Sequence, residues 1–201
     1  LQIMSNFRRN GSVSMNYTAW IHYGLAQLTS FFGRHEVAID EYRLSIACDP
    51  DNARSWRCMG FLQAKTGQHD AAINTLREAL RVDAADSNTR FNLGFLLHQL
   101  NRIDEAIAEF EQVIAANTNN DRAWYGLGLC REQKGELDKA VDALKEAARI
   151  QYFNPHAGHR LALLYHRMGR REALLAEYER VNGFDPKFGD QIRRETGITA
   201  G

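Results

Sequence analysis

The histidines are the first candidates for chemistry, because three of them fall within eleven residues. His156 and His159 are three residues apart, so they would share one face of a helix and could share a metal ion. His166 lies seven residues beyond His159, about 10 Å along a helix, which is too far for the same site. Glu132 is a conceivable third ligand. The spacing favours side chains that titrate near neutral pH, and we predict no metal site.

The spacing of the cysteines and the lack of known catalytic motifs also argue against a metal site or an active site. Cys48, Cys58 and Cys130 are odd in number, far apart and without a C-x-x-C pair, which favours a reducing compartment over disulfides or zinc. The sequence has no G-x-S-x-G elbow, no phosphate-binding loop and no H-E-x-x-H pair. We therefore predict no catalytic residue, no cofactor and a protein that is not an enzyme.

Charge and hydropathy exclude two further classes of function. The 201 residues include 25 basic and 25 acidic side chains, so no basic excess is available to neutralise phosphates. No stretch approaches the roughly 18 consecutive apolar residues of a membrane span. We expect a cytoplasmic protein without a nucleic-acid partner and without a membrane-spanning segment.

A repeated unit must position any functional residues. Trp56 and Gly60 recur 68 residues later as Trp124 and Gly128, and Gly94 keeps the register midway, so the period is 34 residues. Each unit shows apolar residues at helical spacing in both halves, which predicts two helices joined by a tight turn. The five predicted repeats span residues 17–52, 53–86, 87–120, 121–154 and 155–188.

Columns of like residues in this alignment explain the predicted helix pairs. A helix N-cap precedes each unit: Asn16, Asn52, Asp86, Asn120 and Asn154. A residue that accepts positive φ forms each turn: Gly33, Gly67, Asn101, Gly135 and Gly169. An acid opens each second helix, where the helix dipole favours it: Glu36, Asp70, Asp104, Asp138 and Glu172. Small residues bring the paired helices together: Gly24, Gly60, Gly94, Gly128 and Ala162 facing Ala38, Ala72, Ala106 and Ala140, with Leu174 in the last unit. Trp20, Trp56 and Trp124 should fill the space around them.

These columns resemble the tetratricopeptide repeat family, with its W-x2-L-G-x2-Y start, glycine turn and A-x3-F motif, here Ala106 with Phe110. The middle units depart from its final proline, with Ala84, Thr118 and Tyr152 in that place. The resemblance implies an all-α, right-handed superhelical solenoid of five helix-turn-helix repeats plus a short C-terminal capping helix. We assign residues 1–16 to a segment outside the repeats, with Gly11 as a breaker, and residues 189–201 to the capping helix and tail.

In the resembling family, the first helix of each repeat lines a concave groove, through its second, fifth, ninth and twelfth places. Transferred to this chain, those places provide an apolar and aromatic floor flanked by arginines. The predicted partner-binding residues are Arg54, Arg57, Phe61, Phe91, Asn92, Phe95, His98, Arg122, Tyr125, Leu129, His159 and Leu163.

We therefore predict a scaffold or adaptor that binds a protein or peptide with apolar anchors and acidic character. One subtype of the family clamps a terminal carboxylate through five residues. Arg57, Asn92 and Arg122 match three of its places, but Phe61 and Gly126 do not match the other two, so we do not expect a clamp. Two alternatives stay open. The chain starts at Leu1 rather than methionine, which allows a recruitment domain of a larger enzyme such as a transferase. Phe31, Phe32 and residues 1–14 allow self-association through the solenoid ends.

Overall fold

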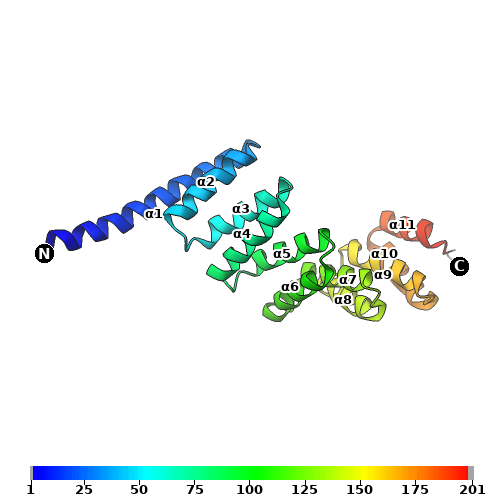
Figure 1. Ribbon diagram of the computed structural model, residues 1–201. Helices are drawn as coiled ribbons and strands as arrows, with labels where there is room; N and C mark the ends of the chain where they lie inside the picture. The colour runs from blue at the N-terminus through cyan, green and yellow to red at the C-terminus, as the bar shows by residue number, and fades with distance from the viewer. Residues whose placement is uncertain (1, 199–201) are drawn as a thin grey trace. The chain divides into compact units, whose positions relative to one another are not determined.

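The computed structural model describes residues 2–198, with the course of the backbone alone over residues 2–16 (Figure 1). This part of the chain forms eleven α-helices and no strand, so the predicted all-α class is confirmed. The helices are α1 (Gln2–Phe31), α2 (His35–Cys48), α3 (Ala53–Lys65), α4 (His69–Val82), α5 (Ser87–Gln99), α6 (Ile103–Ala116), α7 (Asp121–Gln133), α8 (Leu137–Ile150), α9 (Pro155–Arg167), α10 (Arg171–Phe184) and α11 (Pro186–Thr196). Every helix among residues 2–198 is too short or too polar to cross a bilayer.

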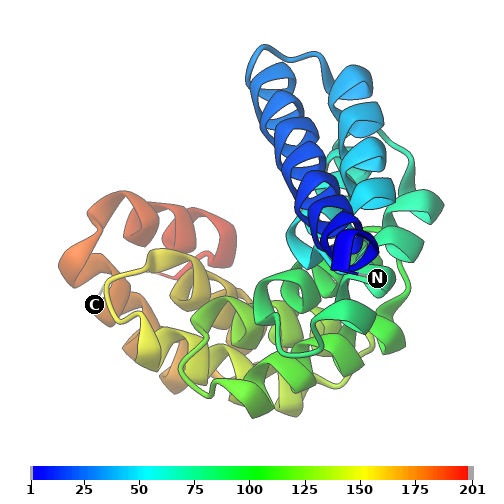
Figure 2. The same cartoon turned by 90° about the vertical axis from the view of Figure 1, so that its left-hand side faces the viewer.

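Short turns with one left-handed residue join the two helices of each predicted repeat. All five predicted turn residues have positive φ: Gly33, Gly67, Asn101, Gly135 and Gly169. Asn101, with φ of 59°, shows that asparagine can replace glycine at this place. The predicted acids lie in the first turns of α2, α4, α6, α8 and α10. Figure 2 shows α1 and α2 as such an antiparallel pair.

Four of the five predicted N-caps are confirmed, and one is wrong. The side chains of Asn52, Asp86, Asn120 and Asn154 accept hydrogen bonds from backbone N–H groups of the helices that follow. Asn16 lies inside α1, because this helix begins at Gln2 and continues through Gly11 without a break. The first helix is therefore 30 residues long, and Figure 1 shows its N-terminal half projecting beyond α2.

The small-residue column holds in the later repeats but not in α1. A Cβ at Gly60 would lie 2.8 Å from Leu76 Cγ, and one at Gly128 would lie 2.6 Å from Leu144 Cγ, so these glycines permit close helix contact. Gly24 has nothing within 4 Å of that place. Counted back from the turn, the matching residue is Ala26, which is fully buried. Trp20 is likewise 67% exposed, so its prediction as a core residue is wrong.

Two compact units divide the chain, the first ending at Leu96 and the second beginning at Leu97. The first unit has a core between α1, α2 and α3, made of Ala26, Ala38, Ile39, Tyr42, Ile46, Met59 and Leu62. The second unit has a core that runs from α8 to α11 and includes Leu144, Leu161, Leu164 and Ile192. Ile192 is fully buried, so α11 packs onto α9 and α10 as the predicted capping helix.

Polar contacts connect successive helix pairs through the predicted acids. Gln68 donates to Glu36 at 3.2 Å in the first unit. In the second unit, Lys134 donates to Asp104 and Arg170 donates to Asp138, both at 2.6 Å. These three acids therefore have two roles, because each lies at the positive end of a helix and also accepts a hydrogen bond from the turn of the next repeat.

Candidate partner-binding surfaces

Nine of the twelve predicted partner-binding residues lie on two surfaces, one in each compact unit. The α3–α5 surface, in the first unit, comprises Arg54, Arg57, Phe61, Phe91, Asn92 and Phe95. The α7–α9 pocket, in the second unit, is lined by His98, Tyr125, Leu129, Glu132, Gln133, Arg160 and Arg167. Three residues of this pocket, His98, Tyr125 and Leu129, belong to the predicted set.

The α3–α5 surface exposes aromatic rings. Phe61 is 55% exposed and Phe95 is 49% exposed, although both stand on helices that bury leucines on their other faces. The ring of Phe91 stacks on Phe95 with 6.5 Å between the centroids. Two half-exposed phenylalanines at equivalent places of successive repeats give a surface that a partner could desolvate.

Arg57 has a structural role that the sequence did not predict. Its Nη1 atom lies 2.7 Å from a carboxylate oxygen of Asp86, the N-cap of α5. The Asp86 carboxylate also accepts hydrogen bonds from the backbone N–H and the hydroxyl of Thr89. Burial alone would raise the pKa of Asp86, but the bonds from Thr89 and Arg57 outweigh it and lower this pKa. Arg57 therefore ties α3 to the start of α5.

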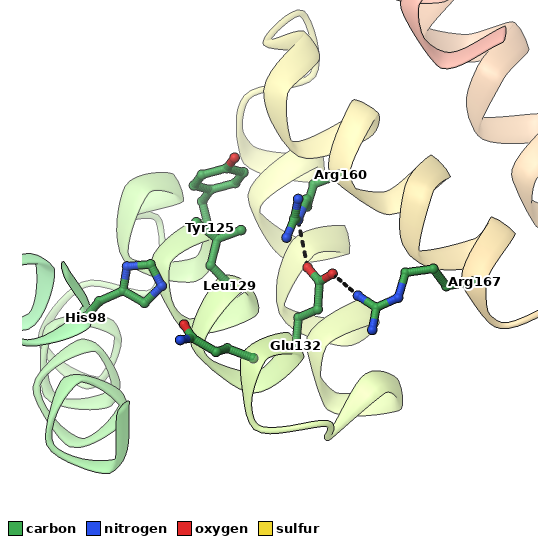
Figure 3. Close-up of a pocket in the computed structure, with 7 residues that line it drawn as sticks. His98, Tyr125, Leu129, Glu132, Arg160 and Arg167 are labelled. Atoms are coloured by element: carbon green, nitrogen blue, oxygen red, sulfur yellow. Dashed lines mark hydrogen bonds and ion pairs between the residues drawn. The ribbon is translucent and has the colours of Figure 1, made fainter. Parts of the chain in front are cut away.

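The α7–α9 pocket is an open hollow of about 530 Å³ (Figure 3). Tyr125 and Leu129 supply its apolar side, from α7. His98 comes from the last turn of α5, and Arg160 and Arg167 come from α9. Burial raises the pKa of the Tyr125 phenol. A mixed apolar and cationic lining of this kind suits the side chains of a peptide better than a small apolar ligand.

Glu132 is the most buried charge in this pocket. Its side chain is 5% exposed, and its carboxylate accepts hydrogen bonds from Arg160, at 2.7 Å, and from Arg167. Figure 3 shows both guanidinium groups reaching Glu132 from α9. The arginines are 40% and 54% exposed, so parts of both still face solvent. One carboxylate between two guanidinium groups leaves the pocket with a net positive charge.

The imidazole of His98 lines the pocket from α5. Burial lowers the pKa of its imidazole, and a hydrogen bond with the side chain of Gln133 opposes this only in part. His98 can therefore offer a hydrogen bond without adding a charge.

The three remaining predicted residues lie in the second unit. Arg122 is exposed, while Leu163 is partly buried. His159 pairs with Glu195 at 2.8 Å, and its ring packs on Phe188 together with the ring of His156. Among residues 17–198, whose side chains the structure describes, no three His, Cys, Asp or Glu side chains are grouped to hold a metal ion.

Sequence reasoning missed Gln133, Arg160 and Arg167 and did not assign Glu132 to the binding set. Arg160 and Arg167 follow Glu132 by 28 and 35 residues, about one repeat. Opposite charges one repeat apart, on first helices, are the signal that could have indicated these pairs. A single periodic column does not reveal them, because the partners occupy different places within their repeats.

Family models support the repeat reading directly. One tetratricopeptide repeat model matches residues 51–119, and a second matches residues 96–155. Together the two matches cover residues 51–155, which is more than half of the chain. A comparison with curated protein sequences gave no significant match.

Solved structures show the same fold. A crystal structure of the MamA protein matches with a TM-score of 0.78 and 22% identity over 92% of this chain and 98% of that chain. YrrB, described as a tetratricopeptide protein with an unusual peptide-binding site, matches with a TM-score of 0.72 and 19% identity over 86% of this chain and 90% of that chain. PilF of Pseudomonas aeruginosa matches with a TM-score of 0.72 and 16% identity over 92% of this chain and 95% of that chain.

Proposed function

Because the chain belongs to the tetratricopeptide repeat family, we propose that it is a non-enzymatic module that binds a segment of a partner protein along its first helices. The fold is typical of protein–protein interaction, and YrrB, of similar fold, carries a peptide-binding site. The observation that supports the proposal most is the exposure of Phe61 and Phe95 on the α3–α5 surface. About half of each residue is open to a partner.

The two surfaces suit different kinds of ligand side chain. Phe61 and Phe95 offer apolar area whose desolvation contributes roughly 25 cal/mol per Å². In the α7–α9 pocket, Arg160 and Arg167 can turn their exposed N–H groups to a carboxylate of the ligand while Glu132 holds their positions. The preferred ligand is therefore a peptide with large apolar anchors and an acidic residue.

The test begins with a phage-displayed peptide library selected on the full chain. Enriched peptides are synthesised, labelled and titrated by fluorescence anisotropy. We expect Phe61→Ser with Phe95→Ser to raise Kd at least tenfold, since both anchors lose their apolar contact. The matched control is Val37→Ser with Leu44→Ser on α2, where the exposed fractions are 46% and 47%. That control should leave Kd unchanged.

Arg57 is a poor choice for this test, because its replacement would also disturb Asp86. Failure to enrich any peptide, or equal weakening by both double variants, would count against the proposal. Circular dichroism of each variant checks that helical content is retained.

A further inference from the structure

Helix α1 is apolar on two opposite faces. Ala19 and Ala26 are buried on the face that packs into the first unit. The opposite face carries Tyr17, Trp20, Ile21, Leu25, Leu28 and Phe31, which all fall within an arc of about 140° at 3.6 residues per turn. We call these six residues, with Phe32 of the turn, the α1 stripe. A helix that is apolar on both faces is normally covered on both.

The α1 stripe is large and well exposed. Its aromatic members are between 64% and 84% exposed, and its aliphatic members between 38% and 54%. If a large aromatic side chain offers roughly 200 Å², the stripe presents roughly 800 Å² of apolar surface. The largest apolar patch on a typical monomer is roughly 300–600 Å². About 800 Å² per partner is what a standard stable protein interface buries.

Gly24 lies in the middle of the α1 stripe. A Cβ there would meet nothing within 4 Å, so the fold of one copy does not require glycine. Glycine within a helix costs roughly 0.5–1 kcal/mol relative to alanine. Apolar residues are placed symmetrically in sequence around Gly24. Trp20 and Leu28 lie four residues from it, and Tyr17 and Phe31 lie seven residues from it. A glycine flanked in this way allows a second helix to approach closely.

The charge of this surface favours a second copy as the partner. Residues 17–31 contain no Lys, Arg, Asp or Glu, and the one histidine, His22, pairs with Glu41 of α2. A two-fold interface brings the same surface together twice, so a charged surface would repel itself and an uncharged one does not.

We propose that α1 packs antiparallel against α1 of a second copy, about a two-fold axis at Gly24. In this register Trp20 faces Leu28 of the second copy, and Tyr17 faces Phe31 of the second copy. Ile21 and Leu25 pack beside them. An open hollow of about 530 Å³, lined by Leu28, Thr29, Phe32 and Arg34, lies at the end of the stripe where Tyr17 of the second copy arrives.

The first experiment is sedimentation velocity of the full chain between about 1 and 100 µM. We expect a dimer that dissociates on dilution. Gly24→Arg should weaken dimerisation at least 100-fold, because two arginines meet at the axis, and the open space around Gly24 leaves the monomer intact. Leu28→Asp should act similarly. Leu44→Asp is the matched control, since Leu44 is 47% exposed on α2, and it should remain dimeric.

A cross-linking experiment tests the direction of the helices. Tyr17→Cys and Phe31→Cys variants are mixed and treated with a short bismaleimide, with the wild type as the background for its own cysteines. If the two α1 helices are antiparallel, the mixture of the two variants forms a cross-linked dimer. Either variant by itself gives only the background level of cross-linking.

Three outcomes would overturn the proposal. The first is a wild type that stays monomeric to 100 µM, and the second is a Gly24→Arg dimer of unchanged affinity. The third is a monomer that co-sediments with vesicles containing anionic lipid and loses this binding in Leu28→Asp, which would assign the stripe to a membrane surface.

Discussion

Glu132 shows how a single buried charge organises the second unit. Removing one partner of a buried ion pair commonly costs about 3–5 kcal/mol, because the remaining charge is left without compensation. Arg160 and Arg167 are partly solvated, so the cost should be smaller here. The role of Glu132 is then to hold two guanidinium groups in place rather than to stabilise the fold strongly.

At the residue scale, we predict that Glu132→Gln lowers the free energy of unfolding by about 1–2 kcal/mol in urea denaturation. The matched control is Glu146→Gln, which removes an exposed pair with Arg149 on α8 and should cost less than about 0.5 kcal/mol. Equal effects of the two changes would show that burial of the Glu132 carboxylate has no energetic consequence.

A second residue-scale prediction concerns pH. The folded-state pKa of Asp86 is lowered, so its contribution to stability is fully present above the unfolded-state pKa of about 3.9 and is lost as pH falls through the folded-state value. Asp86→Asn keeps a capping oxygen and removes the charge. The difference in unfolding free energy between wild type and variant should be constant from pH 7 to 5 and should shrink below pH 4. A difference that persists to pH 2 would contradict this account.

At the scale of elements, the spacing between paired helices depends on the glycines that the repeat pattern identifies. Gly128→Ala would bring a Cβ within 2.6 Å of Leu144, which is fully buried and cannot move freely. We predict a loss of about 1–3 kcal/mol, the usual cost of overpacking. Gly183→Ala, in α10, is the control, because a Cβ there meets nothing within 4 Å. It should be neutral or stabilising, as measured by thermal unfolding.

The elements also show which parts of the structure could be predicted. The turns at Gly67 and Gly135 and the caps at Asn52 and Asn120 depend on residues a few positions away, so periodicity was sufficient. The prediction was wrong at Asn16, Trp20 and Gly24, because α1 continues as one helix from Gln2 to Phe31 and leaves Trp20 exposed on its outer face. The pairing of Arg57 with Asp86 and the double pairing of Glu132 depend on packing between repeats. A column of like residues does not contain that information.

At the scale of the whole molecule, stability should be local, since each helix pair contacts mainly its neighbours. Ile192→Ala removes a fully buried side chain of α11 and should cost about 2–4 kcal/mol within the second unit. Hydrogen exchange should therefore accelerate in α9, α10 and α11 and remain unchanged in α2, α3 and α4. Uniform acceleration throughout the chain would indicate one cooperative unit instead.

The polar contacts between successive helix pairs have a consequence for how such a protein can change in length. Gln68, Lys134 and Arg170 each provide a donor from a turn to the acid that opens the preceding second helix. At each of these junctions the acceptor is the third residue after its own turn residue, and the donor is next to the turn residue of the following repeat, so a duplicated segment of 34 residues brings both halves of the connection with it. Gene duplication can therefore lengthen this molecule without any further change at the new junction, and the number of repeats is a property that evolution can vary independently of what the repeats bind.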